Sequence, residues 1–557
     1  MIYHRGSSGV SPQAFSSNYL LAMSDRSVRW FNVGVSGLAA VLLSSCAVGP
    51  DFVNPAAPDT PRYTKEQLAP RTSSTDAPTG QSQHFVQGRD LIQEWWRLFR
   101  SPALNALVER ALRNNPSLQQ AIATLRASKE AVYAQQGHYF PLVQANFIPE
   151  RQQSAAVLSA PLATGVAPQT FSLYTAQVLV SYNFDVWGLN RRTVEQLQAL
   201  ADNQRFQVEA AYLTLASNVA GAAINEASLR GQIDAALEII AINKKMLDIL
   251  RKQLQTGYAN RNDVALQEAA LAQVEATLPP LRKALQQNRD LLAALTGAYA
   301  SDDPPEKFKL ADLQLPIDLP VSVPSQMIEQ RPDVRAAQET LHAASASVGI
   351  ATANMLPSFS ITANPGYTNT LLAGLLNPAN GFWLIAGNAT QTLFDGGILL
   401  HDLRGARATY DAAAWGYQST VVGAVQNVAD SLRAIQNDAD ALKAARDFER
   451  AAKISLDLAQ QQMQTGYANV LILLTAQQTY LQAITQVVQA RAARLADTAA
   501  LYQALGGGWW NRMEPPTEKV LNVGTGQAAT LVDRPGNFFG EVFGPLIHGP
   551  VQVGTPQ

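Results

Sequence analysis

The chain contains few residues whose types and spacing could support catalysis or metal binding. Its 557 residues include one cysteine and six histidines, and the formal net charge is −2. The histidines lack the short, regular spacing of metal ligands, and no phosphate-binding glycine loop or nucleophile motif occurs. They lie at His4, His84, His138, His342, His401 and His548. The sequence therefore predicts a protein that is not an enzyme, with no cofactor and no metal, and the weak net charge gives no basis for nucleic-acid binding.

The single cysteine, Cys46, is the residue with the clearest predicted chemistry. It ends the sequence Leu43-Ser44-Ser45-Cys46, after two arginines and an apolar stretch too short to span a bilayer. This order resembles a bacterial lipoprotein signal, whose cysteine becomes an N-palmitoyl, S-diacylglycerol amino terminus. We expect residues 1–45 to be a signal peptide and Cys46 a lipid anchor. The alternative is an incidental cysteine, and because residues 1–22 are polar, translation is expected to begin at Met23.

The polar part of the chain is mostly uncharged. Charged residues make up 15% of the sequence, against about 25% in typical soluble domains. Such a composition suits elements that pack closely or line a water-filled space. Residues 47–90 are rich in Pro, Ser, Thr and Gln without apolar periodicity, so we predict that residues 46–100 form a lipidated, extended tether.

The remaining chain repeats one pattern. The hexapeptide Gln-Thr-Gly-Tyr-Ala-Asn at Gln255–Asn260 recurs letter for letter at Gln464–Asn469, 209 positions later (464 minus 255). A period of about 210 residues is far longer than a solenoid repeat. We therefore predict two fused copies of one unit, residues 101–300 and 301–510, followed by a tail, residues 511–557.

Each copy contains segments of alternating apolar and polar residues. They predict hairpins near Phe140–Phe184 and Leu356–Phe394. Alternation of this kind fits an ordinary half-buried sheet as well as a transmembrane barrel. Two hairpins cannot close a barrel alone, because about eight strands are needed, so a barrel would have to be shared among subunits.

A very long helix is predicted after each hairpin. No proline occurs from Leu189 to Leu278 or from Ala379 to Glu514, and Ala, Leu, Gln, Val and Arg dominate both stretches. A helix starting at Leu189 and ending near Gly257 would be roughly 100 Å long. Glycines at 257 and 466 end the long helices, and a return helix follows each. Pro279-Pro280 is expected to interrupt the return helix of the first copy only.

Several motifs, taken in order with the duplication, resemble the TolC-like outer-membrane factors, and most closely the NodT-type efflux lipoproteins. They are Val48-Gly49-Pro50-Asp51-Phe52, Glu94-Trp95-Trp96, Ser101-Pro102-Ala103-Leu104 and Tyr502-Gln503-Ala504-Leu505-Gly506-Gly507-Gly508-Trp509. The resemblance implies a mixed α and transmembrane β fold, built from a duplicated helix-hairpin-long helix-turn-helix unit. It also implies a homotrimer whose 12-stranded β-barrel, four strands per subunit, continues as a periplasmic α-helical barrel.

The function implied by this resemblance is the outer-membrane channel of a tripartite efflux system, a passive exit duct for small molecules such as drugs and toxic organics. The protein would be lipid-anchored in the bacterial outer membrane, with a periplasmic extension. Its partners would be a periplasmic adaptor and a proton-driven inner-membrane pump. Two alternatives are the outer-membrane duct of a type I secretion system and a non-conducting periplasmic coiled-coil lipoprotein.

The resemblance also implies two kinds of site. The family's adaptor-docking turns match Gly257, Tyr258 and Ala259 in the first copy and Gly466, Tyr467 and Ala468 in the second, although each glycine also ends a helix whatever it docks. The aperture candidates just past these turns are Asp263, Ile472 and Thr475. The alternative for Asp263 is an ion pair with Arg261 or with a neighbouring helix.

Overall fold

The computed structural model describes residues 47–57, 60, 62–153, 170–465, 469–512, 519–521 and 528–530. The chain forms two compact units. The first, called the strand unit, takes its described residues from Met1–Phe52, Val132–Leu197 and His342–Asp411. The second, called the helix unit, takes them from Val53–Ala131, Gln198–Leu341 and Ala412–Gln557. The predicted signal peptide, Cys46, Gly466, Tyr467, Ala468 and most of the tail lie outside the described residues.

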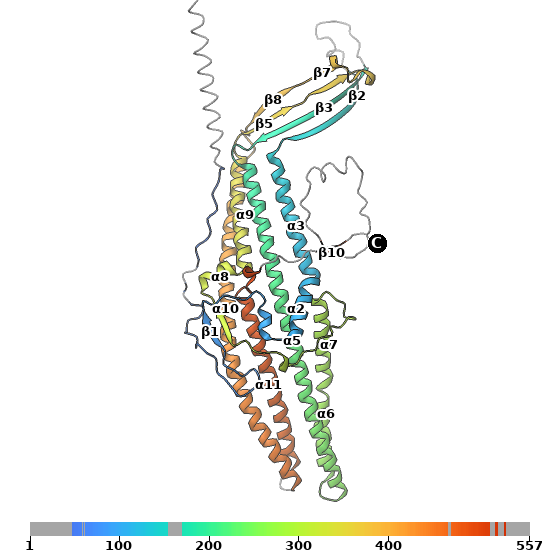
Figure 1. The fold of residues 1–557 in the computed structure, drawn as a ribbon, viewed down its shortest axis with the longest axis vertical. Helices are drawn as coiled ribbons and strands as arrows, with labels where there is room; N and C mark the ends of the chain where they lie inside the picture. The colour runs from blue at the N-terminus through green and yellow to red at the C-terminus, as the bar shows by residue number, and fades with distance from the viewer. Residues whose placement is uncertain are drawn as a thin grey trace, which may run out of the picture. The chain divides into compact units, whose positions relative to one another are not determined.

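The strand unit contains one antiparallel sheet in which the predicted hairpins are confirmed (Figure 1). The first hairpin pairs β2 with β3, and β3 pairs on its other side with β5 and β6 in succession. The sheet is completed by β8 against β5 and β7 against β6. The strands are β2 (Leu142–Gln153), β3 (Thr170–Phe184), β5 (Ser358–Ala363), β6 (Gly366–Asn369), β7 (Gly381–Phe382) and β8 (Ile385–Thr390).

Local sequence explains where these strands break and end. Pro365 separates β5 from β6 because proline has no N–H to donate, although its carbonyl still accepts from Val178 N at 2.9 Å. The last strand ends at Thr390, four residues before the predicted Phe394. Asp395 then accepts from Gly397 N and Leu399 N, both at 2.8 Å, and so prepares the start of the next helix.

The helices follow the predicted order in both copies (Figure 1). The two long ones, α5 and α10, have 67 residues each. The first copy contains α2 (Pro102–Asn114), α3 (Pro116–Gln136), α5 (Leu189–Gln255), α6 (Arg261–Glu275) and α7 (Leu278–Leu295). The second copy contains α8 (Pro324–Gln330), α9 (Pro332–Asn354), α10 (Ile398–Gln464) and α11 (Val470–Ala504). No helix among these described residues is both apolar and long enough to cross a membrane.

The proline pair at 279 and 280 has the predicted effect on the return helix. In the first copy the return helix is divided into α6 and α7, and the prolines lie in the first turn of α7, where a missing N–H costs little. In the second copy α11 is continuous over 35 residues. The duplicated helices are therefore not equivalent.

The main core of the helix unit lies where the short helices meet the long ones. Trp95, Trp96 and Phe99 of η1 (Trp95–Phe99) are fully buried, and Trp95 stacks on Tyr502 of α11 with 5.5 Å between ring centroids. Alanines of α5, including Ala220 and Ala223, lie in the same core and allow close approach of the helices.

The segment preceding η1 is a correction to the sequence interpretation. The strand β1 (His84–Gln87) pairs in parallel with β4 (Asp318–Val321). The fully buried guanidinium of Arg494 donates to the carbonyl oxygens of Thr79 (2.8 Å) and Gln81 (2.6 Å). Composition alone predicted a free tether, but its backbone carbonyls satisfy a buried cation, so this segment packs as part of the helix unit.

The remaining described elements are short 3-10 helices and two short strands, β9 and β10, which pair with each other. They are η2 (Gly137–Tyr139), η3 (Leu310–Asp312), η4 (Leu372–Gly374), η5 (Pro378–Asn380), η6 (Trp509–Asn511), β9 (Lys519–Leu521) and β10 (Ala528–Thr530).

Candidate functional site

One face of the sheet in the strand unit is apolar and uncovered. Paired residues in the ladders share a face, and the register brings Val143 opposite Val180, and Tyr182 opposite Ile361. Val143 is 63% exposed, and Phe147 on the same face is 56% exposed. None of the four apolar cores of the described chain includes a residue of this sheet. An ordinary half-buried sheet would pack this face against a core, so that alternative does not fit.

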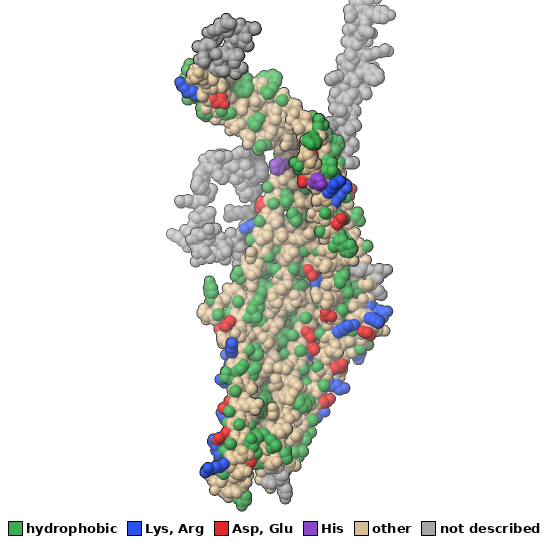
Figure 2. Space-filling view, turned by 180° about the vertical axis from the view of Figure 1, so that it is seen from behind, with side chains coloured by type: hydrophobic (Ala, Val, Ile, Leu, Met, Phe, Trp, Pro, Cys, Tyr) green, Lys and Arg blue, Asp and Glu red, His purple; other side chains and the backbone are tan. Residues whose placement is uncertain are grey.

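The opposite face carries mostly neutral polar side chains, with some apolar ones such as Leu142 and Leu179 among them. Asn146 lies opposite Gln177, and Asn183 opposite Ser360. The hydroxyl oxygens of Thr175 and Thr368 are 3.1 Å apart across neighbouring strands. The only charged residues in the described strands of this sheet are Glu150 and Arg151, near the outer end of β2. Figure 2 accordingly shows charges over the helices and at the strand tip, with few over the strand bodies.

Aromatic residues lie toward both ends of the apolar face. Tyr182 and Phe184 contact edge to face near the base of β3, with 5.2 Å between ring centroids, and Phe359 pairs with Phe184. The second group lies ten residues away along β3, where Tyr174 is found. Phe147 and Tyr367 belong to the same group, and both pair with Ala176. Two aromatic groups flanking an aliphatic band form the pattern found where strands cross two membrane interfaces.

The sheet has two edges that pair with no strand among the described residues. One edge is β2, and the other is formed by β7 and β8. The sheet has four rows of strands, namely β2, β3, β5 with β6, and β8 with β7. Neighbouring rows are antiparallel, so β2 and β8 run in opposite directions. Exposed edges of this kind offer free N–H and C=O groups to another chain.

The residues that directly follow Cys46 are held at the base of the strand unit. The N–H of Val48 donates to the Trp187 carbonyl at 3.0 Å, just after β3 ends. The Arg192 guanidinium on α5 donates to the Val48 carbonyl at 3.1 Å and contacts the Asp51 carboxylate at 2.8 Å. We name residues 47–52 with Arg192 the amino-terminal clamp.

Close backbone approach explains a glycine in the clamp. Gly49 has φ of +96°, and a Cβ there would lie 2.4 Å from the Cα of Gly349 on α9. A side chain at Gly49 would therefore both strain the backbone and displace the segment. Phe52 then stacks on His342 at 4.4 Å between ring centroids, so this histidine has a packing role. The described residues contain no group of three potential ligands that could hold a metal ion.

The turn after α5 displays its tyrosine to solvent. Gly257 has φ of +81°, and the N–H of Tyr258 donates to the Gln253 carbonyl at 2.8 Å while that of Gly257 donates to Leu254 at 3.2 Å. These two bonds form a Schellman motif, which needs a residue in the left-handed region. The Tyr258 side chain is 87% exposed, whereas Ala259 packs against a neighbouring apolar core. A Cβ on Gly257 would meet no atom within 4 Å, so only the backbone conformation restricts this position.

Asp263 has a local structural role that the sequence interpretation did not include. Its N–H donates to Asn260 Oδ1 at 2.9 Å, and its carboxylate accepts from the Asn260 N–H at 3.1 Å. This reciprocal pair is a capping box that starts α6. The carboxylate is half-buried, and no ion pair to Arg261 occurs in the part of the chain that the structure describes. The spacing Asn260-x-x-Asp263 was the signal that could have revealed the cap.

The second copy has no acidic residue in the equivalent cap. Asn469 accepts from the Ile472 N–H at 3.1 Å, but the Ile472 side chain cannot return a hydrogen bond and is 51% exposed. The Thr475 hydroxyl donates to the Leu471 carbonyl at 2.9 Å within α11. The first turns of α6 and α11 therefore differ, with a carboxylate in one and an exposed isoleucine in the other.

Comparison with known proteins agrees with this geometry. The family model described as "Outer membrane efflux protein" matches residues 107–298 and again residues 323–507, which is more than half of the chain. The chain belongs to the outer membrane efflux protein family. The two matched segments also correspond to the two copies of the internal repeat.

Curated relatives match over most of their length. The toluene efflux pump outer membrane protein TtgC of Pseudomonas putida is 27% identical over 477 residues, covering 85% of this chain and 95% of the relative. Outer membrane protein OprJ of Pseudomonas aeruginosa is 27% identical over 491 residues, covering 86% and 96%. The protein is thus an outer-membrane efflux protein.

Solved structures show the same fold. The CmeC outer membrane channel of Campylobacter jejuni superposes with a TM-score of 0.74 at 21% identity, covering 83% of this chain and 95% of that chain. The MtrE outer membrane channel of Neisseria gonorrhoeae, solved in its open state, gives a TM-score of 0.71 at 26% identity, covering 83% and 99%. A non-conducting coiled-coil lipoprotein, one of the two alternatives, has no need of the sheet that these channels share.

Proposed function

We propose that three copies of this chain form the outer-membrane exit duct of a tripartite efflux system. The observation that carries the proposal is the sheet of the strand unit, which has an exposed apolar face and two free edges. Four strand rows per chain give 12 in a trimer, an even number that allows β8 of one copy to meet β2 of the next in antiparallel pairing. Closure would remove both edges and turn the apolar face toward lipid.

The long helices would extend this barrel into the periplasm as a helical barrel. Helices α5 and α10 begin in the strand unit and continue into the helix unit, so each chain supplies continuous elements for both parts. A duct of this kind needs no catalytic residue. Small molecules would pass through it after an inner-membrane, proton-driven pump delivers them.

The amino-terminal clamp supports lipid anchoring at Cys46. Val48 is bonded to Trp187, three residues after β3 ends at Phe184, and Ala47 lies beside Gly188, so a lipid on the preceding cysteine would be attached close to this end of the strands. A lipid there would insert at the same membrane interface as the strands. Mass spectrometry of the mature amino terminus should find a triacylated Cys46, and an unmodified cysteine would refute the anchor.

The exposed turns would form the periplasmic tip that docks on an adaptor protein. Tyr258 is presented by a rigid Schellman turn, and the identical hexapeptide in the second copy supports the same assignment for Gly466, Tyr467 and Ala468. Asp263 and Ile472 lie in the first turn of the helices that follow, and Thr475 lies in the second turn of α11. Three copies of Asp263 around an axis would form an acidic ring, and three of Ile472 an apolar constriction.

Reconstitution and susceptibility measurements together test the proposal. The purified protein should migrate as a trimer that dissociates only on heating, and it should conduct ions in planar bilayers. Deleting the gene should sensitise cells to small toxic organics, and the wild-type gene should restore resistance. Absence of conductance from intact trimers would refute the duct. If the deletion strain keeps normal resistance but retains a protein that wild-type cells secrete, the result would instead indicate type I secretion.

A further inference from the structure

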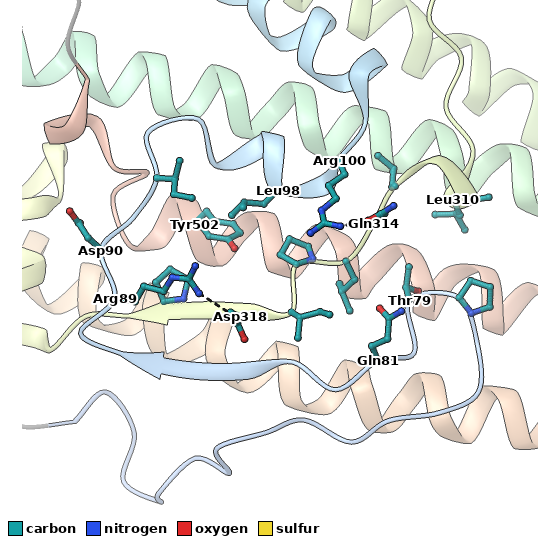
Figure 3. Close-up of a pocket in the computed structure, with 18 residues that line it drawn as sticks. Thr79, Gln81, Arg89, Asp90, Leu98, Arg100, Leu310, Gln314, Asp318 and Tyr502 are labelled. Atoms are coloured by element: carbon teal, nitrogen blue, oxygen red, sulfur yellow. Dashed lines mark hydrogen bonds and ion pairs between the residues drawn. The ribbon is translucent and has the colours of Figure 1, made fainter.

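The helix unit contains a cavity of about 700 Å³ that the proposed duct does not use. Its walls come from the segment before η1, from η1 itself, from the connection between α7 and β4, and from α11 (Figure 3). Leu98, Ile92 and Leu310 supply apolar wall, and Arg89, Arg100 and Tyr502 supply polar groups. This volume lies within the range of sites for small organic ligands.

Backbone strain in the described chain is concentrated at this cavity. Only two of its non-glycine residues have positive φ, Thr79 at +61° and Arg100 at +48°, and both line the cavity. Glycine would occupy either position at lower cost, and the left-handed region is especially unfavourable for β-branched threonine. Residues held in this way gather at ligand-binding sites, where the side chain has a purpose that glycine cannot serve.

The hydrogen-bond donors around the cavity have unused capacity. Tyr502 is 1% exposed, and its hydroxyl has no partner among the described residues. Figure 3 shows this hydroxyl directed into the space between Arg89 and Arg100. The Thr79 hydroxyl is likewise unpartnered. Arg100 is exposed, and its guanidinium makes one long bond, 3.4 Å to Gln314 Oε1, and no ion pair within the described chain, so most of its five N–H groups are open to solvent or to a ligand.

The acidic groups at the same cavity are already satisfied. Asp318 is paired with Arg89 at 3.2 Å and lies 3.5 Å from His84. The Asp90 carboxylate accepts from Leu91 N, Trp510 Nε1 and Asn511 Nδ2 at 2.8 to 3.1 Å. The site therefore lacks acceptors rather than donors. The two carboxylates balance Arg89 and Arg100 in formal charge, but the Arg100 guanidinium still has N–H donors without a partner among the described residues, which favours a ligand with a single negative charge.

We infer that this cavity binds a small organic carboxylate, with the carboxylate on the Arg100 guanidinium and the Tyr502 hydroxyl and an apolar body against Leu98 and Leu310. Bidentate pairing of a carboxylate with guanidinium supplies both charge and direction. A phosphate monoester, which carries nearly two charges, is the poorer match because Asp90 and Asp318 lie in the same walls. Such a ligand would join the segment before η1 to α11.

Calorimetric titration of the full-length protein in nanodiscs tests the inference with benzoate, phenyl phosphate and benzyl alcohol. Benzoate should bind with a dissociation constant below about 1 mM, which is well within what a ligand of its size can reach. Benzyl alcohol, which has the same ring without the charge, should bind at least about 10-fold more weakly. Equal binding of benzoate and benzyl alcohol, or tighter binding of phenyl phosphate, would overturn the carboxylate assignment.

Two variants locate the ligand. Arg100→Gly should weaken benzoate binding at least about 10-fold while leaving the melting temperature equal or higher, because glycine relieves the positive φ. Tyr502→Phe should weaken binding about 3- to 10-fold. The matched control is Arg97→Ala in η1, the short helix that ends just before Arg100, since Arg97 is held by Glu94 and Glu109 and does not line the cavity. Unchanged benzoate affinity in Arg100→Gly would refute the site.

Discussion

A charge introduced on the apolar face of the sheet should destabilise the assembled protein far more than the same charge on the polar face. Val178 and Gln177 are the best matched pair, because they are adjacent in β3 and point to opposite faces. Val178 lies opposite Ala145, and Gln177 lies opposite Asn146. We expect Val178→Arg to impair assembly in the outer membrane and Gln177→Arg to be tolerated.

The magnitude follows from depth in the sheet. From Phe184 to Tyr174 the apolar face spans ten residue steps of about 3.3 Å, or roughly 33 Å along the strand. With a barrel-like tilt of about 45°, this corresponds to roughly 23 Å, close to the apolar band of about 25 Å in outer-membrane barrels. Val178 lies near the middle of the band, so Val178→Arg should cost about 2 to 4 kcal/mol. Ile361 lies opposite Tyr182 nearer one end, so Ile361→Arg should cost about 1 kcal/mol.

The assay is urea unfolding of folded protein in lipid vesicles, read by loss of the heat-modifiable trimer on gels. The expected order of destabilisation is Val178→Arg, then Ile361→Arg, then Gln177→Arg. Unfolded chains of all three variants carry the same added charge, so differences report the folded state. Equal stability of Val178→Arg and Gln177→Arg would refute a lipid-facing apolar surface. A reversed order for Val178 and Ile361 would refute the depth assigned to the band.

Three further predictions concern the helices. Gly257→Val should reduce efflux while the trimer and its outer-membrane location persist, because valine resists φ of +81°. Normal efflux would show that this turn is not part of the docking tip. Asp263→Asn should lower cation selectivity in single-channel recordings. Unchanged selectivity, with a loss of only about 1 kcal/mol of stability, would show that Asp263 serves only as a helix cap. Burial, together with a hydrogen bond to Asp497, raises the pKa of Asp438 to about 7, so its stabilising contribution is complete below about pH 4 and is lost as pH rises through 7. Asp438→Asn should therefore raise the melting temperature by an amount that grows from about pH 4 to about pH 7 and stays constant above that, and a pH-independent change would contradict this.

Periodicity predicted the parts of the fold that depend on local pattern. Apolar alternation located both hairpins, and the absence of proline located α5 and α10, because each reflects a repeating environment along one element. The ends were less predictable. The alternating segment of the first copy was short, yet β2 runs to Gln153, since the outer strand is stabilised by pairing with β3 rather than by its own pattern.

The parts that sequence could not predict depend on single long-range contacts. Arg494 holds the carbonyls of Thr79 and Gln81 across more than 400 residues, and nothing in the local composition of the segment before η1 signals this. The amino-terminal clamp is similar, because Asp51 and Arg192 are ordinary charged residues until folding brings them together. For the candidate sites, Tyr258 is exposed, as a docking turn would require, whereas the capping role of Asp263 was available in the spacing and was missed.

The amino-terminal clamp has a consequence for how the protein enters the membrane. Only Ala47 separates the proposed lipid on Cys46 from Val48, which is bonded to Trp187 just after β3 ends. A tether this short raises the effective concentration of the strands at the bilayer to the millimolar range. Insertion then becomes an intramolecular step rather than a search through the periplasm. Loss of Arg192 should accordingly slow the rate of assembly more than it lowers the stability of the finished trimer.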